Sequence, residues 1–92
     1  MIKDTLDLNS FSKTRAMNLS GGNKRKLCCA MSLIGCPALE FLDEPTTGVD
    51  PISRRCLMKL LKRLDLTSMI LTTHRMDEAE ALCGKIAIMI NG

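Results

Sequence analysis

Aromatic residues are nearly absent from this sequence of 92 residues, which contains two phenylalanines and neither tryptophan nor tyrosine. Proteins that bind single-stranded nucleic acids stack the bases on exposed aromatic rings. We therefore expect no nucleic-acid partner. Long apolar runs are also missing, because Ser32, Gly35 and Pro37 interrupt the longest weakly polar run, residues 27–39. A run of that length suits a buried helix, so no part of the chain is expected to cross a membrane.

Histidine occurs once, at position 74, which excludes a zinc site of the Cys2His2 type. The five cysteines are odd in number and include no Cys-x-x-Cys pair. Buried, reduced thiols in a reducing compartment are therefore expected. The residues after Met1 are mixed and polar, so no secretory signal peptide is expected.

Apolar residues are frequent enough for one small domain, since they make up 46% of the chain, while the net charge is only +3. Basic residues gather at positions 24–26 and again between Arg54 and Arg63. Solvated helix faces are the favoured interpretation of both clusters, and contacts with phosphates or lipid headgroups are the alternative.

Helix and strand patterns alternate along the chain. Ser20 and the pair Asp50-Pro51 are favourable helix starts, and the short apolar stretches between the helices predict strands. The expected helices lie at residues 2–8, 21–35, 51–64 and 77–82, and the expected strands at 39–43, 69–73 and 86–90. This order predicts an α/β fold with a parallel sheet and right-handed crossovers.

Polar residues follow two of the expected strands at their carboxyl ends, where open parallel sheets bind ligands. Asp43 and Glu44 close the first strand, and His74 follows the second. A Mg²⁺ ion would compensate the carboxylate of Asp43, and Glu44 would then accept a proton from an attacking water. The alternatives are a polar turn at residues 43–48 and a structural role for His74.

The sequence Ser20-Gly21-Gly22 stands at an expected helix start. Glycines let a ligand approach the backbone amides, and a helix N-terminus favours an anion. Ser20 caps its own helix, donates to a phosphate, or does both, since a hydroxyl has donor and acceptor capacity.

Four short segments resemble, in their order and spacing, motifs of the ATP-binding-cassette (ABC) nucleotide-binding domain. Residues 19–23 resemble the signature motif, residues 41–45 the end of the Walker B strand, residues 47–51 the D-loop, and residues 71–74 the H-loop. The resemblance implies a partial P-loop NTPase fold over residues 1–92. It also implies that ATP and Mg²⁺ are the cofactors.

Two further segments, residues 23–27 and 78–83, are similar to the ABCA group, whose members mostly transport lipids and sterols. This resemblance implies ATP-driven transport by a complete protein at the cytoplasmic face of a membrane. Its partners would be a second nucleotide-binding domain and the transmembrane domains of the same transporter.

The resemblance also implies a role for individual residues. Asp43 would help to hold Mg²⁺, Glu44 would polarise the attacking water, and His74 would contact the γ-phosphate. Asp50 would couple the two nucleotide sites, although an N-cap role is the simpler interpretation. The signature residues that would face ATP held by the opposite domain are Ser20, Gly21, Gly22 and Asn23.

Three features depart from the family pattern. The sequence has no Gly-x-x-x-x-Gly-Lys-Ser/Thr loop for cradling phosphates, so the chain alone is expected neither to bind ATP tightly nor to hydrolyse it. Glu40 replaces an apolar residue within the first strand, and either lies buried or sits at an exposed strand start. The family's Walker A strand, which lies between the strands at 69–73 and 86–90, is missing. Exposed strand edges and apolar faces are therefore expected.

Two other functions stay open at this level. One is a soluble ABC ATPase of the repair or translation type, and the other is a non-catalytic interaction module that kept the fold. The signature, Glu44 and His74 argue against the second.

Overall fold

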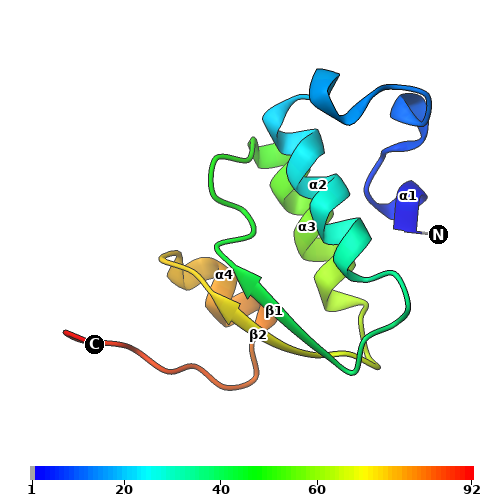
Figure 1. Ribbon diagram of the computed structural model, residues 1–92. Helices are drawn as coiled ribbons and strands as arrows, with labels where there is room; N and C mark the ends of the chain where they lie inside the picture. Colours follow the sequence, from blue (N-terminus) through cyan, green and yellow to red (C-terminus); the bar gives the residue numbers. More distant parts are fainter. Residues whose placement is uncertain (1) are drawn as a thin grey trace.

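A computed structural model of the chain describes residues 2–92, with side chains from Asp4 onward. Helices and two strands alternate along the chain (Figure 1). In chain order the elements are α1 (Ile2–Thr5), the 3-10 turns η1 (Asn9–Phe11) and η2 (Ala16–Asn18), α2 (Gly21–Ser32), β1 (Leu39–Asp43), α3 (Pro51–Lys62), β2 (Ser68–Thr72) and α4 (Met76–Leu82).

The two long helices begin where their capping residues predict. The hydroxyl of Ser20 accepts a hydrogen bond from the backbone N–H of Asn23 at 3.3 Å, and the carboxylate of Asp50 accepts one from the N–H of Ser53 at 2.9 Å. Each cap satisfies a backbone donor that has no partner within its helix. Helix α2 ends at Ser32, earlier than expected.

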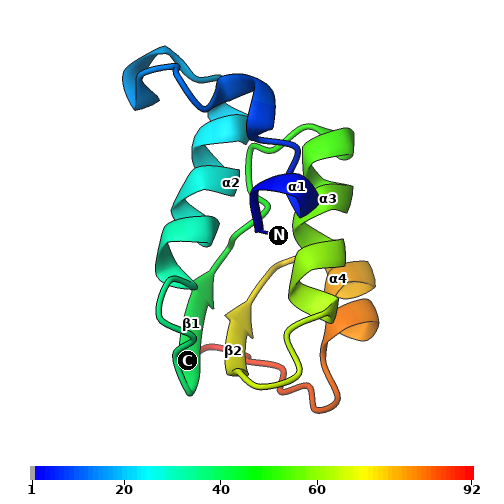
Figure 2. The ribbon, with the colours of Figure 1, turned by 90° about the vertical axis from the view of Figure 1, so that its right-hand side faces the viewer.

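Strands β1 and β2 pair in parallel, with Asp43 opposite Thr72 at their carboxyl ends. Helices α2 and α3 pack side by side over one face of this small sheet, and α4 lies beside α3 (Figures 1 and 2). The core lies between the helices and the sheet. Its buried members are Leu6, Leu8, Cys29, Leu33, Leu42, Leu57, Leu60 and Leu61.

The prediction of a third strand at residues 86–90 is wrong. The described residues form a two-stranded sheet, and this segment is unpaired. After α4 the chain runs away from the rest of the molecule (Figure 1). Ile88 is 72% exposed there. A strand is stable only when a neighbour accepts and donates its backbone hydrogen bonds, and this segment pairs with neither strand of the described residues.

The second face of the sheet is uncovered, in agreement with the exposed apolar faces expected from the sequence. Phe41 is 69% exposed and Ile70 is 53% exposed. Parallel sheets normally have both faces covered. The alternating burial along β1 also decides the position of Glu40, which is buried with 9% of its surface exposed and points with Leu42 towards the helices.

Two expectations about polar and thiol side chains are corrected. Lys26 is buried instead of solvated, because it shares the inner face of α2 with Gly22, Cys29 and Leu33 at helical spacing. All five cysteines are free, but Cys28 and Cys36 are exposed, and Cys29 is the one cysteine that is buried. Among the described residues, no helix has the length and apolar character to span a bilayer.

Candidate functional site

The carboxyl ends of β1 and β2 bring the segments after both strands together. The backbone N–H of Glu44 donates to the carbonyl oxygen of Thr72 at 3.0 Å. The hydroxyl of Thr72 donates to Oδ1 of Asp43, and it accepts from the same Glu44 N–H at 3.2 Å. Thr72 therefore holds the turn from Asp43 into Glu44 against the end of the neighbouring strand.

Glu44 and His74 are in direct contact. Nδ1 of His74 lies 2.9 Å from Oε2 of Glu44, and the hydroxyl of Thr47 donates to the same oxygen at 3.0 Å. The other oxygen, Oε1, accepts no hydrogen bond from a described side chain, while the backbone N–H of His74 also helps to lower the pKa of the carboxyl. One carboxylate oxygen thus anchors the side chain, and the second is open to water or a ligand.

The backbone of Glu44 has a φ of +45°, in the left-handed region that residues other than glycine rarely adopt. Such a conformation costs on the order of 1 kcal/mol and persists only where the surroundings enforce it. The hydrogen bonds to Thr72 and Thr47 enforce it here. They direct the side chain towards His74.

The electrostatic surroundings keep Glu44 ionised at neutral pH. Partial desolvation raises the pKa of the carboxyl, but hydrogen bonds from His74 and Thr47 outweigh it, so the net pKa lies below the usual value. The carboxylate therefore acts as a hydrogen-bond acceptor over the physiological pH range.

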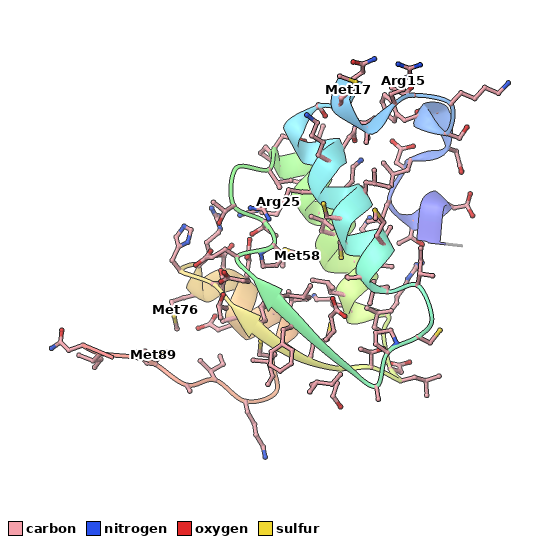
Figure 3. All side chains as sticks on the ribbon, viewed as in Figure 1. Arg15, Met17, Arg25, Met58, Met76 and Met89 are labelled. Carbon is pink, nitrogen blue, oxygen red and sulfur yellow. The ribbon has the colours of Figure 1, made fainter. Side chains whose placement is uncertain are left out.

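Asp43 lies at the same strand end, but it opens into a different pocket. A pocket of about 180 Å³ is lined by Asp43 and Arg25, and Arg25 reaches from α2 towards the end of β1 (Figure 3). A second pocket of about 270 Å³ is lined by His74, Arg75 and Arg54. The structure thus joins Glu44 to His74, and it places Asp43 and His74 in two separate openings.

The residues near Asp43 could supply only a small part of the ligands of a magnesium ion. In the part of the chain that the structure describes, no group of three or more His, Cys, Asp or Glu side chains could hold a metal ion. Mg²⁺ in nucleotide sites often takes one or two carboxylates and completes its shell with water and phosphate oxygens. Asp43 could supply one carboxylate ligand, with the Thr72 hydroxyl beside it, and the remaining ligands would be water and phosphate oxygens.

The signature-like residues lie elsewhere, at the start of α2. This helix start lies beside the start of α3 and away from the arrowheads of the strands (Figure 1). A Cβ atom at Gly22 would lie 2.6 Å from Oδ1 of Asp50, whereas one at Gly21 would meet nothing within 4 Å. Gly21 is therefore open to a ligand, and Gly22 allows the two helices to meet.

Asp50 and Ser20 both act as helix caps. The backbone N–H and the hydroxyl of Ser53 lower the pKa of Asp50 by donating to its carboxylate. Asn23, whose backbone N–H bonds Ser20, is half-buried in the first turn of α2. These caps are compatible with ligand contacts at the same helix starts.

The sequence reasoning missed Glu78, which is fully buried on α4 beneath the loop that carries His74. Glu78 lies on the same helix face as Leu82, four residues further on. A carboxylate on the face of a helix that carries an apolar residue was the signal available in the sequence. Its partners, Thr46 and Thr73, were also overlooked.

Comparisons with known proteins agree with the resemblance. No protein-family model matches the chain. The chain is 53% identical over 91 residues to ATP-binding cassette sub-family A member 2 of Homo sapiens, covering 97% of this chain and 4% of that protein. It is 51% identical over 89 residues to the phospholipid-transporting ATPase ABCA7 of Homo sapiens, covering 95% of this chain and 4% of that protein.

A third relative is the retinal-specific phospholipid-transporting ATPase ABCA4 of Homo sapiens, with 48% identity over 90 residues, 96% of this chain and 4% of that protein. The chain thus spans about 4% of the length of the curated relatives that it matches. Over nearly its whole length, this chain is a relative of one short segment of the sub-family A ATP-binding cassette transporters.

Proposed function

We propose that this chain is the signature-to-H-loop portion of the nucleotide-binding domain of a lipid-transporting ABC ATPase. The contact between Glu44 and His74 at the ends of two parallel strands is the observation that carries the proposal. The chain is about 50% identical to two phospholipid-transporting ATPases, and this similarity supports a lipid as the transported substrate. The complete protein would work at the cytoplasmic face of a membrane, together with its transmembrane domains.

In this function, Glu44 orients the water that attacks the γ-phosphate. Its anchored Oε2 and open Oε1 suit that task, because the open oxygen accepts a hydrogen bond from water while the other keeps the side chain in place. An ionised carboxylate with a lowered pKa is a weak base. Positioning of the water therefore contributes more than proton abstraction, as is usual in phosphoryl transfer.

His74 bridges Glu44 and the γ-phosphate. A histidine ring has two nitrogens, and each of them can take part in a hydrogen bond. Nδ1 is directed to Glu44 at 2.9 Å, which leaves Nε2 for a phosphate oxygen. Asp43 and the hydroxyl of Thr72 would contribute to holding Mg²⁺, which neutralises charge on the phosphates when it is bound.

The start of α2 serves a second nucleotide site, formed with another nucleotide-binding domain. Ser20, Gly21, Gly22 and Asn23 would face the ATP held by that domain, with Gly21 providing the open approach to the backbone. Asp50 lies against Gly22 and belongs to the loop that leads from Glu44 to α3. This contact supports a role for Asp50 in coupling the two sites.

A chimera tests the proposal on this sequence. The matching segment of a phospholipid-transporting relative is replaced by this chain, and ATP hydrolysis and nucleotide binding are measured. Glu44→Gln should lower the hydrolysis rate at least ~100-fold while ATP binding is retained. Glu80→Gln removes an exposed carboxylate and should leave both unchanged.

Movement of a fluorescent phospholipid in reconstituted vesicles provides the second measurement. It should stop in the Glu44→Gln chimera and continue in the Glu80→Gln chimera. A Glu44→Gln chimera that hydrolyses ATP at the unmodified rate would overturn the catalytic role. Hydrolysis without phospholipid movement in the unmodified chimera would overturn the lipid assignment.

A further inference from the structure

Glu78 is a completely buried carboxylate at the centre of a hydrogen-bonded cluster. The hydroxyl of Thr46 lies 2.7 Å from both of its carboxylate oxygens, and the hydroxyl of Thr73 donates to Oε2 at 3.2 Å. Nε of Arg75 lies 3.4 Å from Oε1, and Nη1 of Arg54 lies 3.8 Å from the same oxygen.

A carboxylate removed from water costs several kcal/mol unless donors and opposite charges replace the lost hydration. Two hydroxyls and two guanidinium groups replace it here. A buried carboxylate restrains the hydroxyls that donate to it, because loss of either bond leaves a buried polar atom unsatisfied. The cluster therefore restrains Thr46 and Thr73, whereas Nε of the neighbouring Arg54 is buried without a hydrogen-bond partner among the described residues.

The partners of Glu78 belong to the two segments that carry the reactive side chains. Thr46 follows Glu44 by two residues, and Thr73 immediately precedes His74. The hydroxyl of Thr73 also accepts from the backbone N–H of Arg75 at 3.1 Å, which closes the turn around His74. Glu78 thus connects the turn after β1 to the turn after β2.

The contact between Glu44 and His74 cannot maintain this geometry by itself. The side chain of His74 is 67% exposed and that of Glu44 is 34% exposed. Even an exposed pair of opposite charges contributes only about 0–1 kcal/mol, because water screens it and both side chains lose conformational freedom. The strand pairing and Thr72 hold the first residues of the two turns together, and a buried interaction further along both turns would fix their relative position.

We propose that Glu78 is a positioning residue that holds the turns bearing Glu44 and His74 so that these two side chains meet. The inference rests on the proposed function for its catalytic meaning, since an oriented Glu44–His74 pair matters only if the pair acts on a nucleotide. The geometric part concerns this chain alone and can be tested without ATP.

The geometric test uses ¹⁵N NMR of the His74 ring in the 92-residue chain, which shows which ring nitrogen carries a proton. A ring nitrogen held against a carboxylate carries its proton. The unmodified chain should therefore show a protonated Nδ1. Glu44→Gln gives the reference spectrum of a ring that has lost its carboxylate partner.

Thr46 offers a matched pair of variants. Thr46→Val removes the hydroxyl and keeps the shape, and Thr46→Ser keeps the hydroxyl. Thr46→Val should move the His74 signals at least halfway towards those of Glu44→Gln, and Thr46→Ser should leave them near their original positions. Equal spectra for the two variants, with the fold intact by circular dichroism, would overturn the proposal.

Glu78→Gln should have the same effect as Thr46→Val, since an amide cannot accept the same set of hydrogen bonds as a carboxylate. Glu80→Gln on the same helix is the control and should change nothing. If Glu78→Gln unfolds the chain, the Thr46 pair decides the question.

Kinetics of the chimera separate this inference from the proposed function. Thr46→Val should lower kcat about 10-fold or more with little change in KM, and Thr46→Ser should restore most of kcat. One outcome is that Thr46→Val changes the NMR spectrum of the 92-residue chain, while hydrolysis by the chimera does not depend on Glu44. This result would refute the proposed function and leave Glu78 as the positioning residue. The opposite outcome is hydrolysis that depends on Glu44 with no NMR effect of Thr46→Val. This result would refute the positioning role of Glu78 and leave the proposed function in place.

Discussion

Gly22 and Asp50 meet where α2 and α3 begin, with no room for a side chain between them. A Cβ atom on Gly22 would lie 2.6 Å from Oδ1 of Asp50 and 3.1 Å from Oγ of Ser53. The other oxygen of the same carboxylate caps α3 through the N–H of Ser53 at 2.9 Å. A larger residue at position 22 must therefore displace the cap of α3.

Gly22→Ala should destabilise the chain, and Gly21→Ala should not. At Gly21 nothing lies within 4 Å of a new Cβ, so alanine should raise the free energy of unfolding by up to about 1 kcal/mol through its helix propensity. At Gly22 the overlap should outweigh that gain and cost about 1–3 kcal/mol in total. Urea unfolding of both variants measures the difference. Equal stabilisation by the two alanines would contradict the close contact.

Cys29 should be the least reactive thiol of the chain. Burial, followed by the charge of Glu40, raises the pKa of Cys29 to about 11. Cys28 and Cys36 are exposed. Because the thiolate is the nucleophile, iodoacetamide should label these two at least ~10-fold faster than Cys29 in the folded chain. Mass spectrometry of the peptides after short exposure provides the measurement.

The same thiol predicts how stability depends on pH in alkaline solution. The folded state keeps the proton of Cys29 up to a pKa of about 11, whereas the unfolded thiol loses it near the ordinary value of 9.0. The free energy of unfolding should therefore fall between these two pH values. Cys29→Ser, measured beside the unmodified chain, should show a weaker fall over that range.

Phe41 should promote aggregation of the isolated chain without stabilising its fold. Its side chain is 69% exposed on the uncovered face of the sheet, and exposed apolar faces and strand edges promote association. Phe41→Lys should raise the concentration at which light scattering begins and change the unfolding free energy by less than about 0.5 kcal/mol. Leu42→Ala, on the buried face, should cost about 2–5 kcal/mol. Unchanged scattering for Phe41→Lys would contradict this explanation.

The isolated chain should not bind ATP at micromolar concentrations. Its sequence contains no glycine-rich loop with a lysine to cradle the phosphates. Asp43 and His74 open into separate pockets that share no lining residue. Isothermal titration with ATP and Mg²⁺ should show no saturable binding. A Kd in the micromolar range would show that the remaining residues suffice.

Local features of the fold follow directly from the sequence. Ser20 and Asp50 begin α2 and α3 because a short polar side chain before a helix satisfies its first backbone donors. The strand over residues 39–43 has the predicted limits, since the flanking Pro37 and Pro45 cannot continue a paired strand. Both results depend on interactions within a few residues of the chain.

Contacts between segments that are distant in the sequence could not be predicted in the same way. The segment 86–90 has the composition of a strand and forms none, because its state depends on a neighbouring strand and not on its own propensity. Glu40 and Lys26 are charged residues that lie buried, which only the packing of α2 on β1 could decide.

The sequence by itself determined that Asp43, Glu44 and His74 would lie at the carboxyl ends of two strands, because strand limits and loop positions are local properties. The tertiary structure alone decided that Glu44 touches His74, that Asp43 opens into a different pocket, and that Glu78 lies beneath both turns. Those relationships depend on which helix face meets which loop, and residues thirty positions apart meet only when the whole chain has folded.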